Sequence, residues 1–591
     1  MKKKRIDTFD GAKPRFLNRG KKRRSVSTLS IPRASDRGVE WVDTVTLSPL
    51  LLLALLPFGF LISPYFTQTA AHPEVAFLKY FSIPLIGLSA GCVVFLGIVR
   101  NEWELPSAWF SIIEKHYKGI ILTVSCVFLV CFAALAVLRY TTLHTSVYDM
   151  GAYDKKIWQI SVAPLSAIPY EVARGHFQPI LIIYGLIYKI FGSPVIIQLL
   201  QATFTISGIV PLYLISKRHL NRANTILAIT LIYLFYPPIG FNAALDFHPD
   251  HIYIPLMLWA FYFAEKDEYI LAIIFAGIGA MAKEPLILGV AFFGLYLAIG
   301  KKQYKIGVIT FLFFLSVFLI VVFKILPYVN QSPALSIGTF PFFENHNKVG
   351  IFNIRSLIDS LLMWKVRKLL FVYFLLSPLL FLPLLEWKRF LPAIPLVAIP
   401  ILSTTYLHSS VDSQYIAGII APAFVALVFS IKRIEDSIGA KYANAFVALV
   451  MVMTITFHFA HGPSPLSLNF WKPGWGEIWH KSNYTSGEHE EVVKEAIYKI
   501  SEDRDITVVS QGNINHSRIT HRYNLYTFPY RWQEADYILL DTKKPLVVGD
   551  HVDEELYLKD LKRIRNNPQF QFEFQKGGVF LFKRAEKGRR N

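Results

Sequence analysis

Long apolar runs separated by short polar segments make up most of the chain up to residue 461. A bilayer core about 30 Å thick needs about 20 apolar residues per helix, and roughly 17 to 25 are usual. The pattern therefore predicts membrane-spanning helices at 46–66, 78–99, 118–138, 194–215, 223–243, 252–265, 306–327, 369–385, 391–406, 412–431 and 443–460.

The apolar stretch 269–300 needs a separate interpretation, because it is too long for one span and short for two. Pro285 has no amide hydrogen and disfavours helix in the residue before it. We therefore expect a hairpin of two short helices with Lys283 and Glu284 at its tip. With the hairpin counted as two, the sequence predicts a polytopic, mainly α-helical bundle of about 13 spans.

The distribution of basic residues predicts the orientation of these spans. Residues 1–40 contain 13 Lys or Arg and 4 Asp or Glu, and cytoplasmic segments are enriched in Lys and Arg. With this tail in the cytoplasm, four basic loops also face the cytoplasm, at 217–222, 301–305, 386–389 and 432–436. A single helix over the hairpin region would instead place the last three outside. The extracytoplasmic face then receives 140–179, 246–251, the hairpin tip, 328–367 and everything after 461.

The residues after 461 differ in pattern from the spans and predict a small extracytoplasmic domain. Segment 488–500 has apolar residues at helical spacing. Four later segments, rich in β-branched and aromatic residues, are predicted strands, at 506–509, 535–541, 570–574 and 578–583. The chain thus divides into a basic cytoplasmic tail (1–45), two N-terminal spans (46–117), a membrane core (118–461) and a mixed α/β domain (462–591).

The composition indicates an integral protein of the plasma (inner) membrane. The chain is 53% hydrophobic and only 17% charged, which is too apolar for a soluble protein of this length. Its formal charge of +19 does not indicate a nucleic-acid partner, since much of the excess lies in the N-terminal tail. Cys92, Cys126 and Cys131 lie in apolar runs, so they predict neither disulfides nor a zinc site.

Segment 139–158 follows a predicted span directly and is rich in charged and aromatic side chains. Asp149 and Asp154 lie at the start of the predicted external loop, with Lys155, Lys156 and Trp158 beside them. Asp149 is therefore expected near the membrane interface. An Asx turn flanked by interfacial tyrosines is the alternative interpretation of the same pattern.

The end of the same loop contains an arginine, a histidine and a proline before a short apolar run. A run this short predicts an interfacial helix that lies on the membrane, with Arg174 and His176 at its start. Cations and helix N-termini bind anions, so this start suits a phosphate group. Simple membrane anchoring is the alternative.

Two carboxylates and two imidazoles crowd one predicted turn between spans: Asp246, His248, Asp250 and His251. That is more than a polar turn requires, and His and Asp side chains suit a divalent cation. A metal ion is therefore one interpretation, although the spacing matches no strict ligand motif. At the hairpin tip, Lys283 and Glu284 lie near membrane depth, where ionisable groups usually line a cavity. Their pairing with each other is the alternative.

Several motifs in this order resemble a known family: YDMGAYDKKIW at 148–158, RGHFQP at 174–179, LDFHPDH at 245–251, AKEP at 282–285, ADYILLD at 535–541 and GGVFLFKR at 577–584. The family is that of predicted polytopic membrane proteins with domain of unknown function 2079, and the resemblance covers roughly residues 118–585. That family in turn resembles the GT-C class of integral membrane glycosyltransferases.

This resemblance implies a GT-C-like fold for the membrane core, and roles for the residues above. In GT-C enzymes the first external loop starts with an aspartate that acts as the base, and Asp149 matches this position. His176 with Pro179 is similar to the His-Pro-type segment that leads a juxtamembrane helix. Asp149 and Asp154 are the predicted catalytic residues. The predicted substrate-binding residues are Lys155, Lys156, Trp158, Arg174, His176, Asp246, His248, Asp250, His251, Lys283 and Glu284.

The implied reaction moves a sugar from a polyprenyl phosphate to an acceptor hydroxyl on the extracytoplasmic side. A phosphate is a good leaving group whose charge Arg or Lys can meet, so the enzyme mainly needs a base for the acceptor. Asp149 is the expected base, the lysines and Arg174 hold the departing phosphate, and Trp158 stacks on the sugar. The expected partners are membrane lipid and the lipid-linked sugar, with a divalent metal ion as the one cofactor under consideration.

Two other classes of protein remain open from the sequence. A transporter or lipid flippase would use the same charged residues to line a pathway, without glycosyl transfer. A non-catalytic membrane scaffold would bind a partner through its C-terminal domain and would tolerate substitution of Asp149, His176 and Asp246 together.

Overall fold

The computed structural model describes residues 78–102, 107–331, 354–404, 406–475, 477–545 and 554–585. The predicted tail at 1–45 and the first predicted span at 46–66 lie outside these residues. So does much of the predicted external loop at 328–367.

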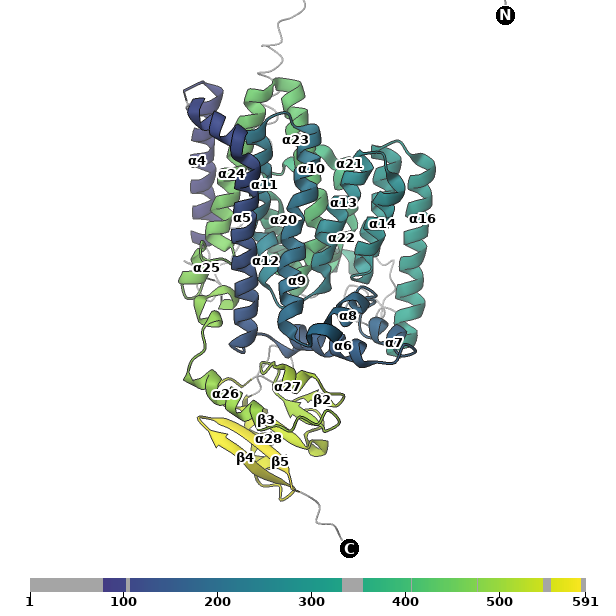
Figure 1. The fold of residues 1–591 in the computed structure, drawn as a ribbon, viewed down its shortest axis with the longest axis vertical. Helices are drawn as coiled ribbons and strands as arrows, with labels where there is room; N and C mark the ends of the chain where they lie inside the picture. Colours follow the sequence, from purple (N-terminus) through teal and green to yellow (C-terminus); the bar gives the residue numbers. More distant parts are fainter. Residues whose placement is uncertain are drawn as a thin grey trace, which may run out of the picture.

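A bundle of apolar helices forms the larger part of the described chain, and a small domain with a β-sheet lies beyond one end of it (Figure 1). The bundle helices are α4 (Ile83–Val99), α5 (Ser107–Thr141), α9 (Pro194–Ser207), α10 (Ile209–His219), α11 (Ala223–Phe235), α12 (Pro237–Ala244), α13 (Tyr253–Glu265), α14 (Tyr269–Ala280), α15 (Glu284–Leu295), α16 (Tyr304–Ile320), α17 (Leu326–Asn330), α20 (Lys365–Leu376), α21 (Trp387–Phe390), α22 (Ile394–Leu402), α23 (Ala417–Ile438) and α24 (Ala440–His461).

Short helices lie at the end of the bundle that faces the small domain (Figure 1). They are α6 (Ala152–Val162), α7 (Ile168–Ala173) and α8 (Leu181–Phe191). The helix predicted after Arg174 and His176 is present as α8, which begins after a turn at 174–180, and its position on the membrane stays a prediction. Two single turns of helix, η2 (Val147–Gly151) and η3 (Pro249–Ile252), also lie at this end of the bundle.

Six helices of the described residues are long and apolar enough to cross a membrane, or up to eight if two bent pairs each count as one span. The bent pairs cover 223–244, with a bend of 49°, and 365–402, with a bend of 87°. The predicted span at 252–265 is α13, which has only 13 residues. The mainly helical membrane architecture is therefore confirmed, whereas the count of about 13 spans is not.

The predicted hairpin is present as α14 and α15, which are joined by a turn at 281–283. The amide of Ile180 donates to the carbonyl oxygen of Met281 at 3.1 Å, so the tip lies beside the start of α8. Lys283 is 3% exposed and Glu284 is fully buried. The two ionisable side chains thus lie below the protein surface.

The loops predicted to face the cytoplasm gather at the end of the bundle away from the sheet. His219 and Lys301 lie 3.4 and 3.5 Å from the carboxylate of Glu265. Arg433 lies 3.8 Å from Glu386. The loop after α5, the turn before η3 and the hairpin tip meet at the opposite end, next to the C-terminal domain. The structure thus separates the two sets of loops, and which end faces the cytoplasm stays a prediction.

The C-terminal sheet has five strands in the order β2-β1-β3-β5-β4. The strands are β1 (Val508–Ser510), β2 (Leu525–Thr527), β3 (Tyr537–Asp541), β4 (Phe570–Lys576) and β5 (Val579–Arg584). β1 pairs in parallel with β2 and β3, while β5 is antiparallel to β3 and β4. Four of these strands and helix α26 (Glu488–Tyr498) correspond to predictions, whereas β2, α27 (Ser517–Thr520) and α28 (Glu554–Arg565) do not.

Candidate active site

Asp149 lies in η2, directly after the loop that ends α5. The Ser146 hydroxyl accepts a hydrogen bond from the Tyr148 amide at 3.0 Å and caps this turn. The Asp149 carboxylate lies 3.3 Å from Nε2 of His248. The Asp149 side chain is 50% exposed, whereas that of His248 is 6% exposed. A buried imidazole thus holds a carboxylate that still reaches solvent.

The charges around this pair keep Asp149 ionised. Burial raises the pKa of Asp149, but the hydrogen bond and charge of His248, together with Lys283 and Arg139, outweigh burial and lower that pKa below its ordinary value. Burial lowers the pKa of His248, but Asp149 and Asp250 outweigh it, and the pKa is raised. The pair therefore combines an ionised carboxylate with an imidazole that gains a proton readily.

Arg139 and Asp246 form a second pair behind Asp149. Arg139 Nη2 lies 3.2 Å from Asp246 Oδ1, and the Ser146 amide donates to Asp246 Oδ2 at 2.9 Å. Arg139 is 7% and Asp246 4% exposed, and the guanidinium lies 5.6 Å from the ring centre of Trp479. This buried pair holds the loop that enters η2.

Lys283 joins the hairpin tip to the turn that carries Asp250. Lys283 Nζ lies 3.7 Å from Asp250 Oδ1 and 5.2 Å from the ring centre of Tyr415. Both charged side chains are buried. The charge of Lys283 also acts on Asp149 and His248. The hairpin tip, the turn and η2 therefore belong to one polar cluster.

Glu284 binds the turn between α7 and α8. Its Oε1 lies 2.8 Å from Nδ1 of His176, and its Oε2 accepts a hydrogen bond from the Phe177 amide at 3.1 Å. Lys283 and Glu284 thus contact Asp250 and His176, in contrast to the alternative in which they only pair with each other. One pocket in this cluster is lined by His176, Asp250, Lys283, His408, Gln414 and Tyr415.

Lys156 also forms hydrogen bonds with the turn between α7 and α8. Its Nζ donates to the carbonyl oxygens of Arg174 and His176, at 2.9 and 3.4 Å, and to Gln178 Oε1 at 2.9 Å. Gln178 in turn donates to the Tyr153 hydroxyl at 2.9 Å. Burial and the charge of Arg174 lower the pKa of Lys156 to about 7. Since an ammonium has three donors, these bonds occupy Lys156 within the protein.

Arg174 is the more accessible cation at this turn. Its side chain is 38% exposed, and Nη2 lies 3.0 Å from Glu171 Oε2. The same nitrogen donates to Gln159 Oε1 at 2.5 Å. Other guanidinium nitrogens of Arg174 are therefore available to a ligand.

Asp154 lies against the C-terminal domain and is fully buried. Its Oδ1 accepts a hydrogen bond from the Tyr188 hydroxyl and lies 3.1 Å from Nε2 of His521. Its Oδ2 accepts a hydrogen bond from the Thr520 hydroxyl. These partners surround the carboxylate, and its predicted catalytic role stays a prediction.

Trp158 and Lys155 lie on the same face of α6 as Asp154. The Trp158 ring stacks on His521, with ring centres 5.7 Å apart and planes 7° apart. The Lys155 ammonium donates to the carbonyl oxygen of Tyr523 at 3.1 Å, and burial lowers the pKa of Lys155 to about 8. This face of α6 contacts the C-terminal domain rather than the Asp149 cluster.

His251 is engaged within the bundle. Its Nε2 lies 2.9 Å from the Tyr184 hydroxyl, and its Nδ1 lies 2.6 Å from the carbonyl oxygen of His248. Burial lowers the pKa of His251 to about 3. Across the residues that the structure describes, no group of three or more His, Cys, Asp or Glu side chains is placed to hold a metal ion.

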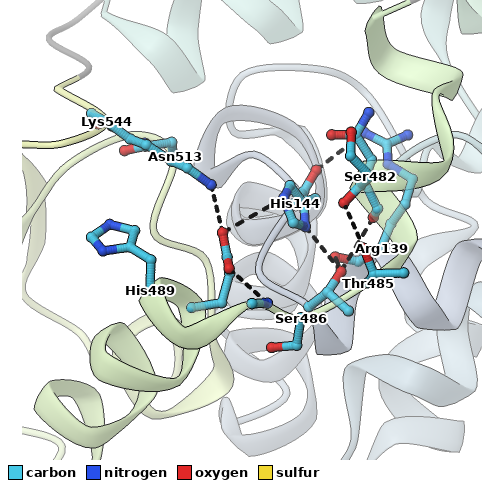
Figure 2. Close-up of polar contacts among 12 residues, drawn as sticks. Arg139, His144, Ser482, Thr485, Ser486, His489, Asn513 and Lys544 are labelled. Carbon is cyan, nitrogen blue, oxygen red and sulfur yellow. Dashed lines mark hydrogen bonds and ion pairs between the residues drawn. The ribbon is translucent and has the colours of Figure 1, made fainter. Parts of the chain in front are cut away.

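A second cavity lies between the bundle and the C-terminal domain, and Figure 2 shows polar contacts in this region, including four residues that line the cavity: His144, His489, Asn513 and Lys544. Glu490 Oε1 binds the Lys544 ammonium at 2.5 Å and lies 4.0 Å from His144 Nε2. His489 Nε2 lies 2.8 Å from Asp541 Oδ2. Burial raises the pKa of Glu490, but hydrogen bonds from Lys544 and backbone amides outweigh it and lower the pKa to about 2. Of these three contacts, the one between His144 and Glu490 joins the bundle to the C-terminal domain, whereas the other two lie within the C-terminal domain.

Comparison with protein families identifies the chain. The model of the family described as "Predicted membrane protein (DUF2079)" matches residues 139–581. The chain belongs to this family. The DUF2079 match begins at Arg139, the arginine that pairs with Asp246, and it includes the polar cluster and most of the C-terminal sheet. The family assignment made from the sequence motifs is therefore confirmed. No curated protein matches this DUF2079 chain.

Several solved structures are similar to this DUF2079 chain. ArnT from Cupriavidus metallidurans bound to undecaprenyl phosphate has 11% sequence identity and a TM-score of 0.46, covering 80% of this chain and 98% of that one. Its apo state has 11% identity and a TM-score of 0.43, covering 79% and 98%. The oligosaccharyltransferase from Archaeoglobus fulgidus has 14% identity and a TM-score of 0.36, covering 70% and 68%.

Five residues of the polar cluster are not among the predicted site residues: Arg139, Tyr153, His408, Gln414 and Tyr415. Arg139 ends an apolar run, and a charge at the end of a span is an available signal. His408 lies between two predicted spans, and Tyr415 lies near the start of the span predicted at 412–431. Their approach to Lys283 depends on how the bundle folds, and the sequence carries no local signal of it.

Proposed function

We propose that this protein is an integral membrane glycosyltransferase that moves a sugar from a polyprenyl phosphate to an acceptor hydroxyl on the extracytoplasmic side. Asp149 is the general base. The observation that carries the proposal is the half-exposed, ionised carboxylate of Asp149, held by the buried His248 at the end of a membrane bundle. Membership of a membrane-protein family is consistent with a lipid-borne donor.

In the proposed step, the acceptor oxygen forms a bond to the anomeric carbon of the sugar while the bond from that carbon to the phosphate oxygen breaks. Asp149 takes the proton of the acceptor hydroxyl, and the electron pair of the broken bond leaves with the polyprenyl phosphate. The lowered pKa of Asp149 means that the base is ready at neutral pH. His248 keeps the carboxylate in place during this transfer.

The departing phosphate needs positive charge close to the membrane surface. Lys283 and His176 line one pocket of the cluster, and Arg174 is partly exposed at the start of the adjoining turn. Asp250 offsets part of the charge of Lys283, so His176 and Arg174 supply the remaining donors to the phosphate. Lys156 supports this arrangement by holding the turn.

The test uses the purified full-length protein in lipid nanodiscs with synthetic polyprenyl phosphates that carry different radiolabelled sugars. Release of label from the lipid to water, or to an extract of envelope glycans, measures turnover. Asp149→Asn keeps the side-chain shape and removes the base, so turnover should fall by about 10² to 10⁴-fold. Lys576→Ala, which removes only an exposed ion pair with Glu495, should leave turnover unchanged.

Two outcomes would overturn the proposal. Full turnover by Asp149→Asn would remove the assigned base. Movement of labelled lipid across liposome membranes by the wild-type protein, without any transfer of the sugar, would instead identify a transporter or flippase.

A further inference from the structure

The C-terminal domain contacts the turn that bears Asp149 on both sides of the carboxylate. Before Asp149, the Val147 amide donates to the carbonyl oxygen of Gly512 at 2.9 Å. After Asp149, a Cβ atom added at Gly151 would lie 2.8 Å from Oδ1 of Asn515. The loop that follows β1 therefore packs against the whole of η2.

The packing between this loop and η2 leaves little room. A Cβ atom added at Gly512 would lie 2.5 Å from a ring carbon of Tyr148, the neighbour of Asp149. Asn515 is fully buried, and its amide donates to the Thr145 hydroxyl at 2.9 Å. The turn cannot shift toward the C-terminal domain without displacing this loop.

A second set of contacts lies one turn of α6 further on. Asp154 is fully buried and meets Thr520 and His521 of the C-terminal domain. Trp158 stacks on the same imidazole. Loss of these partners would leave a buried carboxylate poorly satisfied, which is costly. The buried Asp154 therefore binds the C-terminal domain to the helix that continues from η2.

We infer that segment 511–521 of the C-terminal domain is the positioning element of the active site. It holds residues 145–154 in the orientation that presents Asp149 to His248. The contact between Asp154 and His521 fixes segment 511–521 against α6. Asp154 and His521 are positioning residues, because they act through the backbone of η2 and α6 rather than on a substrate. The catalytic consequence rests on the proposed function, whereas the contact itself does not.

Amide hydrogen exchange of the full-length protein in nanodiscs tests this inference without a substrate. The Val147 amide reports directly on the contact between η2 and segment 511–521, because its acceptor is a carbonyl of the C-terminal domain. His521→Leu removes the bond to Asp154, and exchange of peptides over 145–154 should become about tenfold or more faster. His521→Gln retains a donor and should restore most of the protection. Lys576→Ala is the matched control and should match wild type.

A kinetic variant tests the consequence for catalysis. Gly512→Ala removes no polar group, but its methyl group forces Tyr148 to move. Turnover should fall by between about tenfold and a hundredfold with KM for the lipid donor unchanged. Tyr148→Val in the same protein should recover part of the loss. A merely structural contact would not give this separation of turnover from KM.

The two proposals fail in different ways. Unchanged exchange over 145–154 in a folded His521→Leu protein would overturn the positioning role of segment 511–521, even if transfer depends on Asp149. Faster exchange in that variant, with no sugar transfer by the wild-type protein on any donor, would support the positioning role of segment 511–521 and overturn only the proposed function.

Discussion

Asp149 differs from the other acidic residues of the cluster in its exposure. Asp246 and Asp250 are each 4% exposed, while half of the Asp149 side chain is exposed. A buried carboxylate depends on its partner cation, whereas a solvent-exposed one can exchange water for an acceptor hydroxyl. This contrast supports giving the base role to Asp149 and supporting roles to the other two.

The Asp149–His248 pair predicts a pH dependence of stability. A raised pKa of His248 gives a contribution that is complete below its ordinary value of 6.5 and is lost as pH rises through the higher folded-state value. The lowered pKa of Asp149 gives a contribution present above 3.8 and lost as pH falls through the lower folded-state value. The midpoint temperature of unfolding in detergent, followed by tryptophan fluorescence, should therefore decrease as the pH rises from about 6 to about 9. His248→Gln should flatten this decline, and an equal slope in both proteins would contradict the pairing.

At the scale of elements, the hairpin α14–α15 contributes to the site through its tip. The sequence predicts the hairpin because Pro285 interrupts an apolar run, and the structure adds that the tip meets the turn before η3. Lys283 and Asp250 are the contact between these two elements. The hairpin therefore carries one charge of the cluster into the site.

Substitution of Lys283 should show that this contact holds the elements together. Lys283→Met leaves Asp250 buried without its cation, and the expected loss is about 3–5 kcal/mol of unfolding free energy. Asp250→Asn in the same protein should recover part of the loss, because it removes the unpaired charge. Unfolding by detergent titration measures both proteins. No loss in Lys283→Met would show that the two elements do not depend on this ion pair.

At the scale of the whole molecule, the bundle separates its polar loops into two ends, and the C-terminal domain lies beyond the end that holds the candidate site (Figure 1). The predicted orientation places this domain outside the cytoplasm, because the basic loops gather at the other end. A lipid-linked donor and a polar acceptor would then meet where the bundle ends and the domain begins.

Cysteine labelling tests this orientation in intact cells, once the three native cysteines are replaced. Lys576→Cys lies on the C-terminal sheet and should react with a membrane-impermeant maleimide without permeabilisation. Lys305→Cys lies in the first turn of α16, next to a basic loop, and should react only after the cells are opened. The reverse pattern would contradict the orientation.

The sequence by itself determined the helical membrane class, the hairpin, most of the C-terminal strands and the family, because span length, residue periodicity and motif order are local properties. It also named Asp149, His176, His248, Asp250 and Lys283, which lie close in the sequence to span ends and meet because those ends share one face. Only the tertiary structure decided that the buried Asp154 binds the C-terminal domain, through partners 366 positions away in the case of Thr520. A contact between such distant segments depends on how two separately folded parts pack, and no periodicity along the chain records it.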